Sequence, residues 1–223
     1  MNFEQGIDNK YRTSIEDAFE TILAEGDKFH QFMMQTIIES EMIVCVYPVS
    51  KVNASGITGV TNPSSTNKRI FSERLDLNEA FKEVFITIAE ETIETGGQRG
   101  CEGTFVHEGR HAYDFAQAIV SFSNADVNPL SIFDPNLYEM EWEAHKTAAN
   151  YLLQIGRDEY LKEGLDLLIL GELNGKYYVN EKGIKKRLRN SYGLNEGGNL
   201  GPRISEMAHL KMRSESFFEK LFG

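Results

Sequence analysis

Cysteine is scarce in this sequence, because only Cys45 and Cys101 occur among its 223 residues. They lie far apart and outside any CxxC pattern, so they provide neither a disulfide framework nor a zinc knuckle. Two isolated cysteines are typical of free thiols in a reducing compartment. Residues 1–12, MNFEQGIDNKYR, contain no apolar segment of the kind that a signal peptide requires. We therefore expect a cytoplasmic protein, and secretion or delivery as part of a longer chain stays open.

Long apolar runs and an excess of positive charge are also missing. No apolar stretch approaches the length needed to span a bilayer, so we expect no membrane partner. The formal net charge of -11 repels phosphate backbones, so we expect no nucleic-acid partner. The run KKRLR at residues 185–189 is a local exception, which we interpret as the solvated face of a helix.

The composition that remains is that of a globular protein, with 41% hydrophobic and 26% charged residues. The chain is long enough to bury a substantial core. It contains no internal repeat and no linker, so residues 1–223 are predicted to form one domain. These features do not fix the oligomeric state.

Hydrophobic periodicity predicts a mixture of helices and strands. The predicted helices are two within residues 14–41 that break at Gly26 and Asp27, one from residue 103 to about Ser121, one over 136–156 closed by Gly156, one over 158–170 and one near the end of the chain. The predicted strands lie within residues 42–49 and 81–92, with a short hairpin over 174–180. Turn residues predict a loop or loose hairpin over 53–68 and a glycine-rich turn over 94–100. The fold class expected from this pattern is α+β.

Residues 103–115, GTFVHEGRHAYDF, contain the motif that points most directly to chemistry. On a helix His107 and His111 lie one turn apart, so both imidazoles face the same side and can bind one cation. A catalytic zinc takes three protein ligands and a water, so a third ligand is required. Glu108 is next to the first histidine and can take a proton from that water as a general base.

The residues alone leave the third ligand open. One extended form of the motif places a glycine three residues after the second histidine and a third histidine three residues later. This chain has Asp114 and Gln117 at those places, which argues against a site with three histidines. The next predicted helix offers Glu139, Glu141 and Glu143, but their alternation prevents all three from sharing one helix face.

The two motifs together resemble the gluzincin group of zinc metallopeptidases, in which a HExxH helix is followed by a helix that carries a glutamate. Residues 141–145, EWEAH, are also similar to an E-x-E-A element of small bacterial zincin families. These include the metallopeptidase domains at the ends of polymorphic toxins. The resemblance covers about residues 81–155. It implies a zincin-like domain, with a small mixed or antiparallel sheet packed on the active-site helix and a second ligand-bearing helix.

The resemblance also implies roles for two residues of the second helix. Glu141 matches the third zinc ligand, and His145 matches a residue that contacts the ligands without binding the zinc itself. Asp or Asn is more usual at the position of His145. Whether His145 orients a ligand histidine, contacts substrate or binds the metal directly therefore stays open.

Taken together, these features predict a zinc-dependent hydrolase that acts on a peptide or protein, with Glu108 as its base. Residues 83–89, EVFITIA, are predicted to form the sheet edge beside the cleft and to pair with an extended peptide. Arg110 or a tyrosine is a candidate for stabilising an oxyanion, and the cleavage specificity is not fixed. An alternative is a zincin-like domain that no longer cuts and serves as a binding or interaction module. A further alternative is a structural helix with two histidines and no metal.

Overall fold

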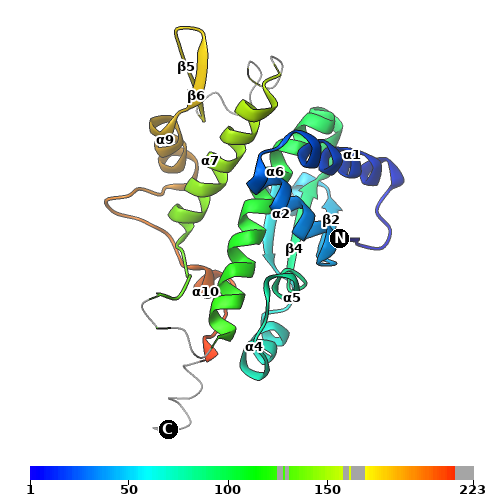
Figure 1. The fold of residues 1–223 in the computed structure, drawn as a ribbon, viewed down its shortest axis with the longest axis vertical. Coiled ribbons are helices and arrows are strands. Elements are labelled where there is room, and N and C mark those ends of the chain that lie inside the picture. The colour runs from blue at the N-terminus through cyan, green and yellow to red at the C-terminus, as the bar shows by residue number, and fades with distance from the viewer. Residues whose placement is uncertain (125–127, 129–130, 158–160, 162–168, 214–223) are drawn as a thin grey trace.

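The computed structural model describes residues 1–124, 128, 131–157, 161 and 169–213, and it combines helices with two small sheets (Figure 1). The strands are β1 (Asn2–Phe3), β2 (Ile43–Tyr47), β3 (Gly56–Val60), β4 (Val84–Ala89), β5 (Leu170–Leu173) and β6 (Lys176–Val179). The helices are α1 (Asn9–Glu25), α2 (Lys28–Glu39), α3 (Val49–Val52), α4 (Pro63–Ser72), α5 (Leu77–Phe81), α6 (Glu90–Ser123), α7 (Leu137–Ile155), α9 (Glu181–Tyr192) and α10 (Ile204–Met207). The expected α+β class is confirmed.

The larger sheet contains four strands in the order β1-β2-β4-β3. β2 runs parallel to β1 and β4, whereas β3 runs antiparallel to β4. The predicted strands β2 and β4 are confirmed, and both are largely buried. The prediction that residues 83–89 form the edge of the sheet is wrong, because β4 lies between β2 and β3. The edge on that side is β3.

The loop or loose hairpin predicted over residues 53–68 is also wrong. Its middle forms β3, which pairs with β4 from Gly56 opposite Ile88 to Val60 opposite Val84. The segment is rich in turn residues, but strand formation depends strongly on the neighbouring strand, and β4 provides that neighbour. Its second half begins α4, which Asn62 caps by accepting a hydrogen bond from the backbone of Ser65.

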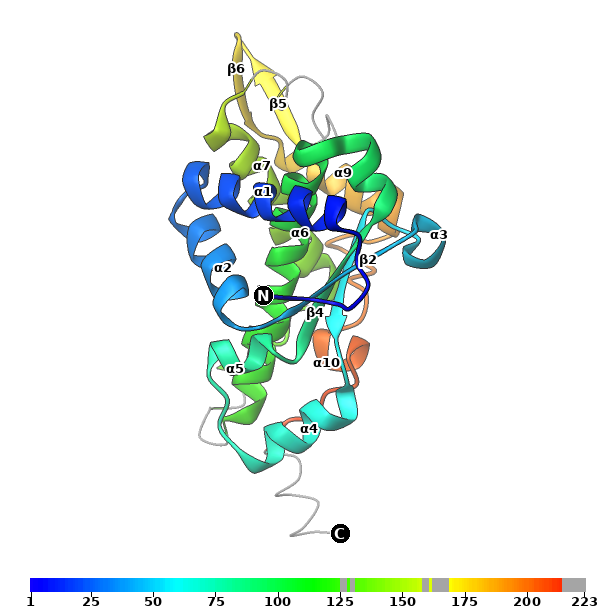
Figure 2. The same cartoon turned by 90° about the vertical axis from the view of Figure 1, so that its right-hand side faces the viewer.

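Helix α6 runs through the middle of the molecule, with the four-stranded sheet on one side and α7 on the other (Figures 1 and 2). The glycine-rich turn predicted over residues 94–100 is instead part of this helix, interrupted at Gly97 (φ 56°, ψ -149°). A residue without a Cβ adopts this conformation at little cost. The part of α6 that follows this kink is mostly buried.

Helix α7 has well-defined ends. The Asn136 side chain accepts a hydrogen bond from the Glu139 backbone, and the Glu139 side chain accepts one from the Asn136 backbone. This reciprocal capping box fixes the first turn. Gly156 closes the helix in the left-handed conformation, as predicted.

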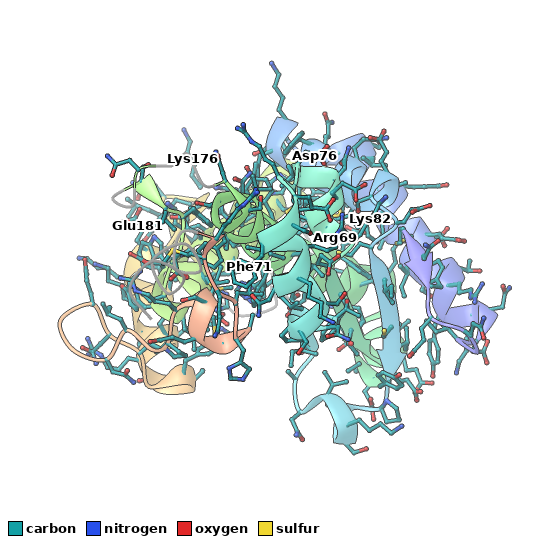
Figure 3. The ribbon with its side chains drawn as sticks, turned by 90° about the horizontal axis from the view of Figure 1, so that it is seen from below. Arg69, Phe71, Asp76, Lys82, Lys176 and Glu181 are labelled. Atoms are coloured by element: carbon teal, nitrogen blue, oxygen red, sulfur yellow. The ribbon has the colours of Figure 1, made fainter. Side chains whose placement is uncertain are left out.

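The smaller sheet and α9 lie on the α7 side of the molecule (Figure 1). β5 and β6 form a hairpin over residues 170–179, so the predicted hairpin is present but begins before the predicted range of 174–180. Seen from below, Lys176 and Glu181 lie on this side, whereas Arg69 and Lys82 lie on the side of α4 and the larger sheet (Figure 3). The helix predicted over residues 158–170 and the one near the end of the chain lie largely outside the described residues.

Most of the buried hydrophobic residues in the described part of the chain belong to one cluster. No helix in this part is both long and apolar enough to cross a membrane. The single domain spanning residues 1–223 stays a prediction.

Candidate metal site

His107 and His111 meet on the face of α6 that contacts α7. Their Nε2 atoms lie 3.1 Å apart. His111 is buried, and His107 is half-buried. The closeness follows from the four-residue spacing within a continuous helix. The structure therefore brings together the two histidines that the motif predicted to share one cation.

Helix α7 brings Glu141 against both histidines. One carboxylate oxygen, Oε2, lies 3.4 Å from Nε2 of His107, and the other, Oε1, lies 3.4 Å from Nε2 of His111. Glu139 and Glu143 lie elsewhere: the first belongs to the capping box, and the second is 3.3 Å from the ammonium group of Lys146. Of the three alternating glutamates, Glu141 is thus the one in contact with the histidines.

The spacing of these donor atoms fits a tetrahedral zinc ion. Two metal–ligand bonds of about 2.0–2.1 Å at the tetrahedral angle separate their donors by about 3.3–3.4 Å. Here the two histidine Nε2 atoms lie 3.1 Å apart, and each lies 3.4 Å from a different oxygen of the Glu141 carboxylate. In the described part of the chain, the buried Oε2 of Glu141 has no hydrogen-bond partner. A buried carboxylate oxygen is costly unless a donor or a cation meets it, so the donor set fits the metal.

The contact between Glu141 and the histidines dominates the electrostatics of the cluster. Burial alone would raise the pKa of Glu141, but the contacts with His107 and His111 outweigh it and hold that pKa far below its ordinary value. Burial alone would lower the pKa of His111, but the Glu141 carboxylate outweighs it and raises that pKa to about 9. Glu141 is therefore ionised at neutral pH, as a metal ligand must be.

Glu108 is directed toward the sheet edge. Oγ1 of Thr58, on β3, donates a hydrogen bond to Oε2 of Glu108 at 2.7 Å and also lies 3.1 Å from its backbone oxygen. Gly56 packs against the same side chain, because a Cβ atom there would lie 2.8 Å from Cγ of Glu108. The edge strand thus holds the predicted base in one position beside His107.

His145 lies one turn after Glu141 on α7 and is buried. Donor atoms of His107, Glu141 and His145 all lie within 4.8 Å of one another, so this trio can also hold a metal ion. Nε of Arg187, from α9, donates a hydrogen bond to Nε2 of His145 at 3.2 Å. Burial and the neighbouring His107 lower the pKa of His145 to about 3, so the ring is neutral and its Nε2 accepts this bond.

Two cavities flank the donor cluster. The first, of about 330 Å³, contains Gly103, His145, Ala148 and Arg187 in its wall. The second, of about 250 Å³, contains side chains of α6, α7 and α10 and extends along β3: Ile57, Thr58, His111, Phe115, Met140, Glu141 and Met207. His107, Glu108, Gly56, Ala54 and Tyr192 line both. The predicted base and the first histidine are therefore reachable from either cavity.

Tyr192, at the last position of α9, is a site residue that sequence reasoning did not single out. It lines both cavities, and its ring centroid is 6.1 Å from that of His145. Burial, followed by the nearby Glu141 carboxylate, raises the pKa of its hydroxyl. Its phenol is therefore protonated at neutral pH and can donate a hydrogen bond into the cavities.

Arg110, a sequence candidate for oxyanion stabilisation, is engaged elsewhere: its guanidinium lies 3.0 Å from Asp114 and stacks near Phe29 and Tyr113. Among the described residues that line the two cavities, Arg187 is the arginine. It belongs to the run KKRLR, where Lys185, Lys186 and Arg189 are exposed as expected and Arg187 is half-buried. The residue types of this run do not indicate that Arg187 is less exposed than the other basic residues.

No protein-family model, no curated protein and no solved structure matches this chain. The gluzincin resemblance of residues 107–111 and 141–145 therefore stays a prediction, and the chemistry has to be argued from the geometry of the site.

Proposed function

We propose that this protein is a metal-dependent hydrolase that binds zinc through His107, His111 and Glu141 and cleaves peptide bonds with Glu108 as its base. The observation that carries the proposal is the convergence of two histidine nitrogens and the Glu141 carboxylate at separations of 3.1–3.4 Å, which suit a zinc ion. Beside them β3 holds a second carboxylate, that of Glu108, in place. A structural site would close with a fourth protein ligand and has no use for such a base.

Zinc at this site would supply Lewis acidity, which polarises a carbonyl group and lowers the pKa of a water molecule. The chain's own groups supply the proton transfers. Glu108 accepts the proton of the attacking water and passes it to the leaving nitrogen, as a positioned carboxylate does in general acid–base catalysis. Tyr192, which lines both cavities and interacts with the Glu141 carboxylate, is the candidate donor to negative charge that develops there.

An extended peptide is the substrate class that the sheet edge supports. Within the described part of the chain, β3 has a strand partner on one side only, namely β4. A peptide paired with its free edge would gain main-chain hydrogen bonds. On this strand Ile57 is 46% exposed, and the neighbouring Thr58 donates a hydrogen bond to the Glu108 carboxylate. We therefore propose β3, and not residues 83–89, as the strand that pairs with the peptide.

The arrangement of elements also supports a zincin-like fold. A mixed sheet packs on the helix that carries the HExxH motif. The next long helix of the described chain brings its glutamate to the same point. Both the mixed sheet and the paired ligand helices agree with what the resemblance implies.

The experiment that tests the proposal measures metal and activity separately. Protein purified without a histidine tag should contain about one zinc per chain. Glu108→Gln should keep the zinc and lose peptide cleavage, because an amide cannot accept the proton. Glu143→Gln, a matched change at a half-buried position of α7 away from the histidines, should keep both.

Three outcomes would count against the proposal. A protein without stoichiometric metal would favour a structural helix. A zinc-loaded protein that cleaves nothing in a broad peptide library would favour a binding module. An active Glu108→Gln variant would remove Glu108 as the base.

A further inference from the structure

His145 is a fourth potential ligand at the edge of the cluster. It is 4% exposed, its ring centroid lies 4.7 Å from that of His107, and its Nε2 lies 3.8 Å from Oε2 of Glu141. A donor atom of His145 already lies within 4.8 Å of donor atoms of His107 and Glu141, so one metal ion is within its reach. Four protein ligands would close the site, whereas a catalytic zinc keeps one position for water or substrate.

The nitrogen of His145 that faces the cluster is already in use. Nε of Arg187 donates to Nε2 of His145 at 3.2 Å. A ring nitrogen has one lone pair in the ring plane, so it cannot accept this hydrogen bond and bind a metal at the same time. A guanidinium does not give up its proton near neutral pH, so its N–H stays a donor whenever the two side chains are in contact.

We infer that Arg187 is a positioning residue that holds His145 out of the metal's ligand set and so keeps the fourth coordination position open. The inference rests on the proposed metal site. The sequence left open whether His145 binds the metal. Under this inference His145 lies next to the ligands without binding the metal, because Arg187 of α9 holds its Nε2. Both side chains line the 330 Å³ cavity, so the position kept open is the one that a molecule in this cavity would reach.

The competing explanation is that Arg187 only attaches α9 to α7. Removing it would then lower stability and leave the metal's ligands unchanged. The number of imidazole rings bound to the metal distinguishes the two explanations, because a purely structural contact would not alter it.

The experiment compares zinc-loaded variants by X-ray absorption, which counts imidazole ligands. Arg187→Met keeps a long apolar stem and removes the donor. We expect about two imidazoles per zinc in the unsubstituted protein and about three in Arg187→Met, with tighter zinc binding in competition with a chelator. In the double variant Arg187→Met, His145→Ala the number should return to about two. Arg189→Met, an exposed arginine on the same helix, is the matched control and should change nothing.

A second measurement needs no substitution. In the zinc-loaded protein, long-range ¹H–¹⁵N spectra should show metal-bound ring nitrogens for His107 and His111. The Nε2 of His145 should instead have the shift of a hydrogen-bond acceptor.

The inference is overturned if His145 is already metal-bound in the unsubstituted protein, or if Arg187→Met retains two imidazoles while remaining folded. A protein that takes up no zinc overturns the proposed function first, and this inference with it.

Discussion

Oγ1 of Thr58 lies 2.7 Å from Oε2 of Glu108, and this hydrogen bond joins the edge strand β3 to the predicted base on α6. The two residues are far apart in the sequence. The same strand is the edge on which we propose that an extended peptide pairs. The strand β3 would therefore position both the Glu108 carboxylate and the substrate backbone. Fewer relative motions of base and substrate would then have to be restricted during the reaction.

Replacing Thr58 should show how much this support contributes. Thr58→Val keeps the shape of the side chain and removes the hydroxyl. A hydrogen bond to a charged group contributes about 1.5–3 kcal/mol, so we expect kcat to fall about 10- to 100-fold while zinc content is unchanged. Thr61→Val, at an exposed position after the end of β3, is the control. If Thr58→Val retained kcat within about twofold, the hydrogen bond would have no role in catalysis.

Adding a methyl group at Gly56 should displace the base from the opposite side. The new Cβ would lie 2.8 Å from both Cγ of Glu108 and Cγ2 of Thr104, so Gly56→Ala should lower stability by about 1–3 kcal/mol and also reduce turnover. Gly59→Ala on the same strand also creates a tight contact, 3.2 Å from the ring of Phe85, but away from the base. We expect it to reduce thermal stability and leave kcat of the folded protein intact. Equal losses of kcat in both variants would contradict this role for Gly56.

The histidine pair and Glu141 could be predicted from the sequence because their relations are mostly local. His107 and His111 are one helical turn apart, and a helix fixes their directions without any knowledge of the rest of the fold. The prediction of Glu141 also required that a second helix pack against the first. The resemblance of the two motifs to the gluzincin pattern implied this packing.

The residues around the donor cluster could not be predicted because their placement depends on contacts between distant segments. Thr58 lies in a segment of turn residues whose strand structure comes from pairing with β4. The same pairing places β4 inside the sheet. The sequence of β4 by itself fits an edge strand as well as an interior one. Arg187 differs from its exposed neighbours only because α9 packs on α7.

The choice among the glutamates of α7 leads to a prediction about metal binding. Glu141→Gln removes a carboxylate from the histidines and should abolish stoichiometric zinc, as measured by elemental analysis after dialysis. Glu139→Gln should keep the zinc, because that side chain caps the helix, and should change stability by about 1 kcal/mol at most. Retention of zinc by Glu141→Gln would exclude Glu141 as a ligand and would favour a site that includes His145.

The protonation of His111 gives a prediction that needs no substrate. Once a chelator has removed the metal, the ring should titrate near pH 9, because the Glu141 carboxylate outweighs the effect of burial. A raised pKa stabilises the folded state fully below the ordinary value of 6.5, and this contribution is lost as the pH rises through about 9. The chelated protein should therefore melt at a lower temperature above pH 9 than at neutral pH.

The same proton must leave when zinc binds, since a ligand histidine is neutral. Calorimetry at pH 7.5 in buffers of different ionisation enthalpy should detect the release of about one proton per zinc from this ring. An NMR titration of the His111 ring gives the direct test. In Glu141→Gln the largest raising influence is lost, while burial still lowers the pKa and the charges of Glu108 and Asp114 still raise it, so the midpoint should fall well below 9. If the unsubstituted protein already titrated at or below 6.5, the carboxylate would not control this histidine, and its contact with Glu141 would have to be weaker than the 3.4 Å separation indicates.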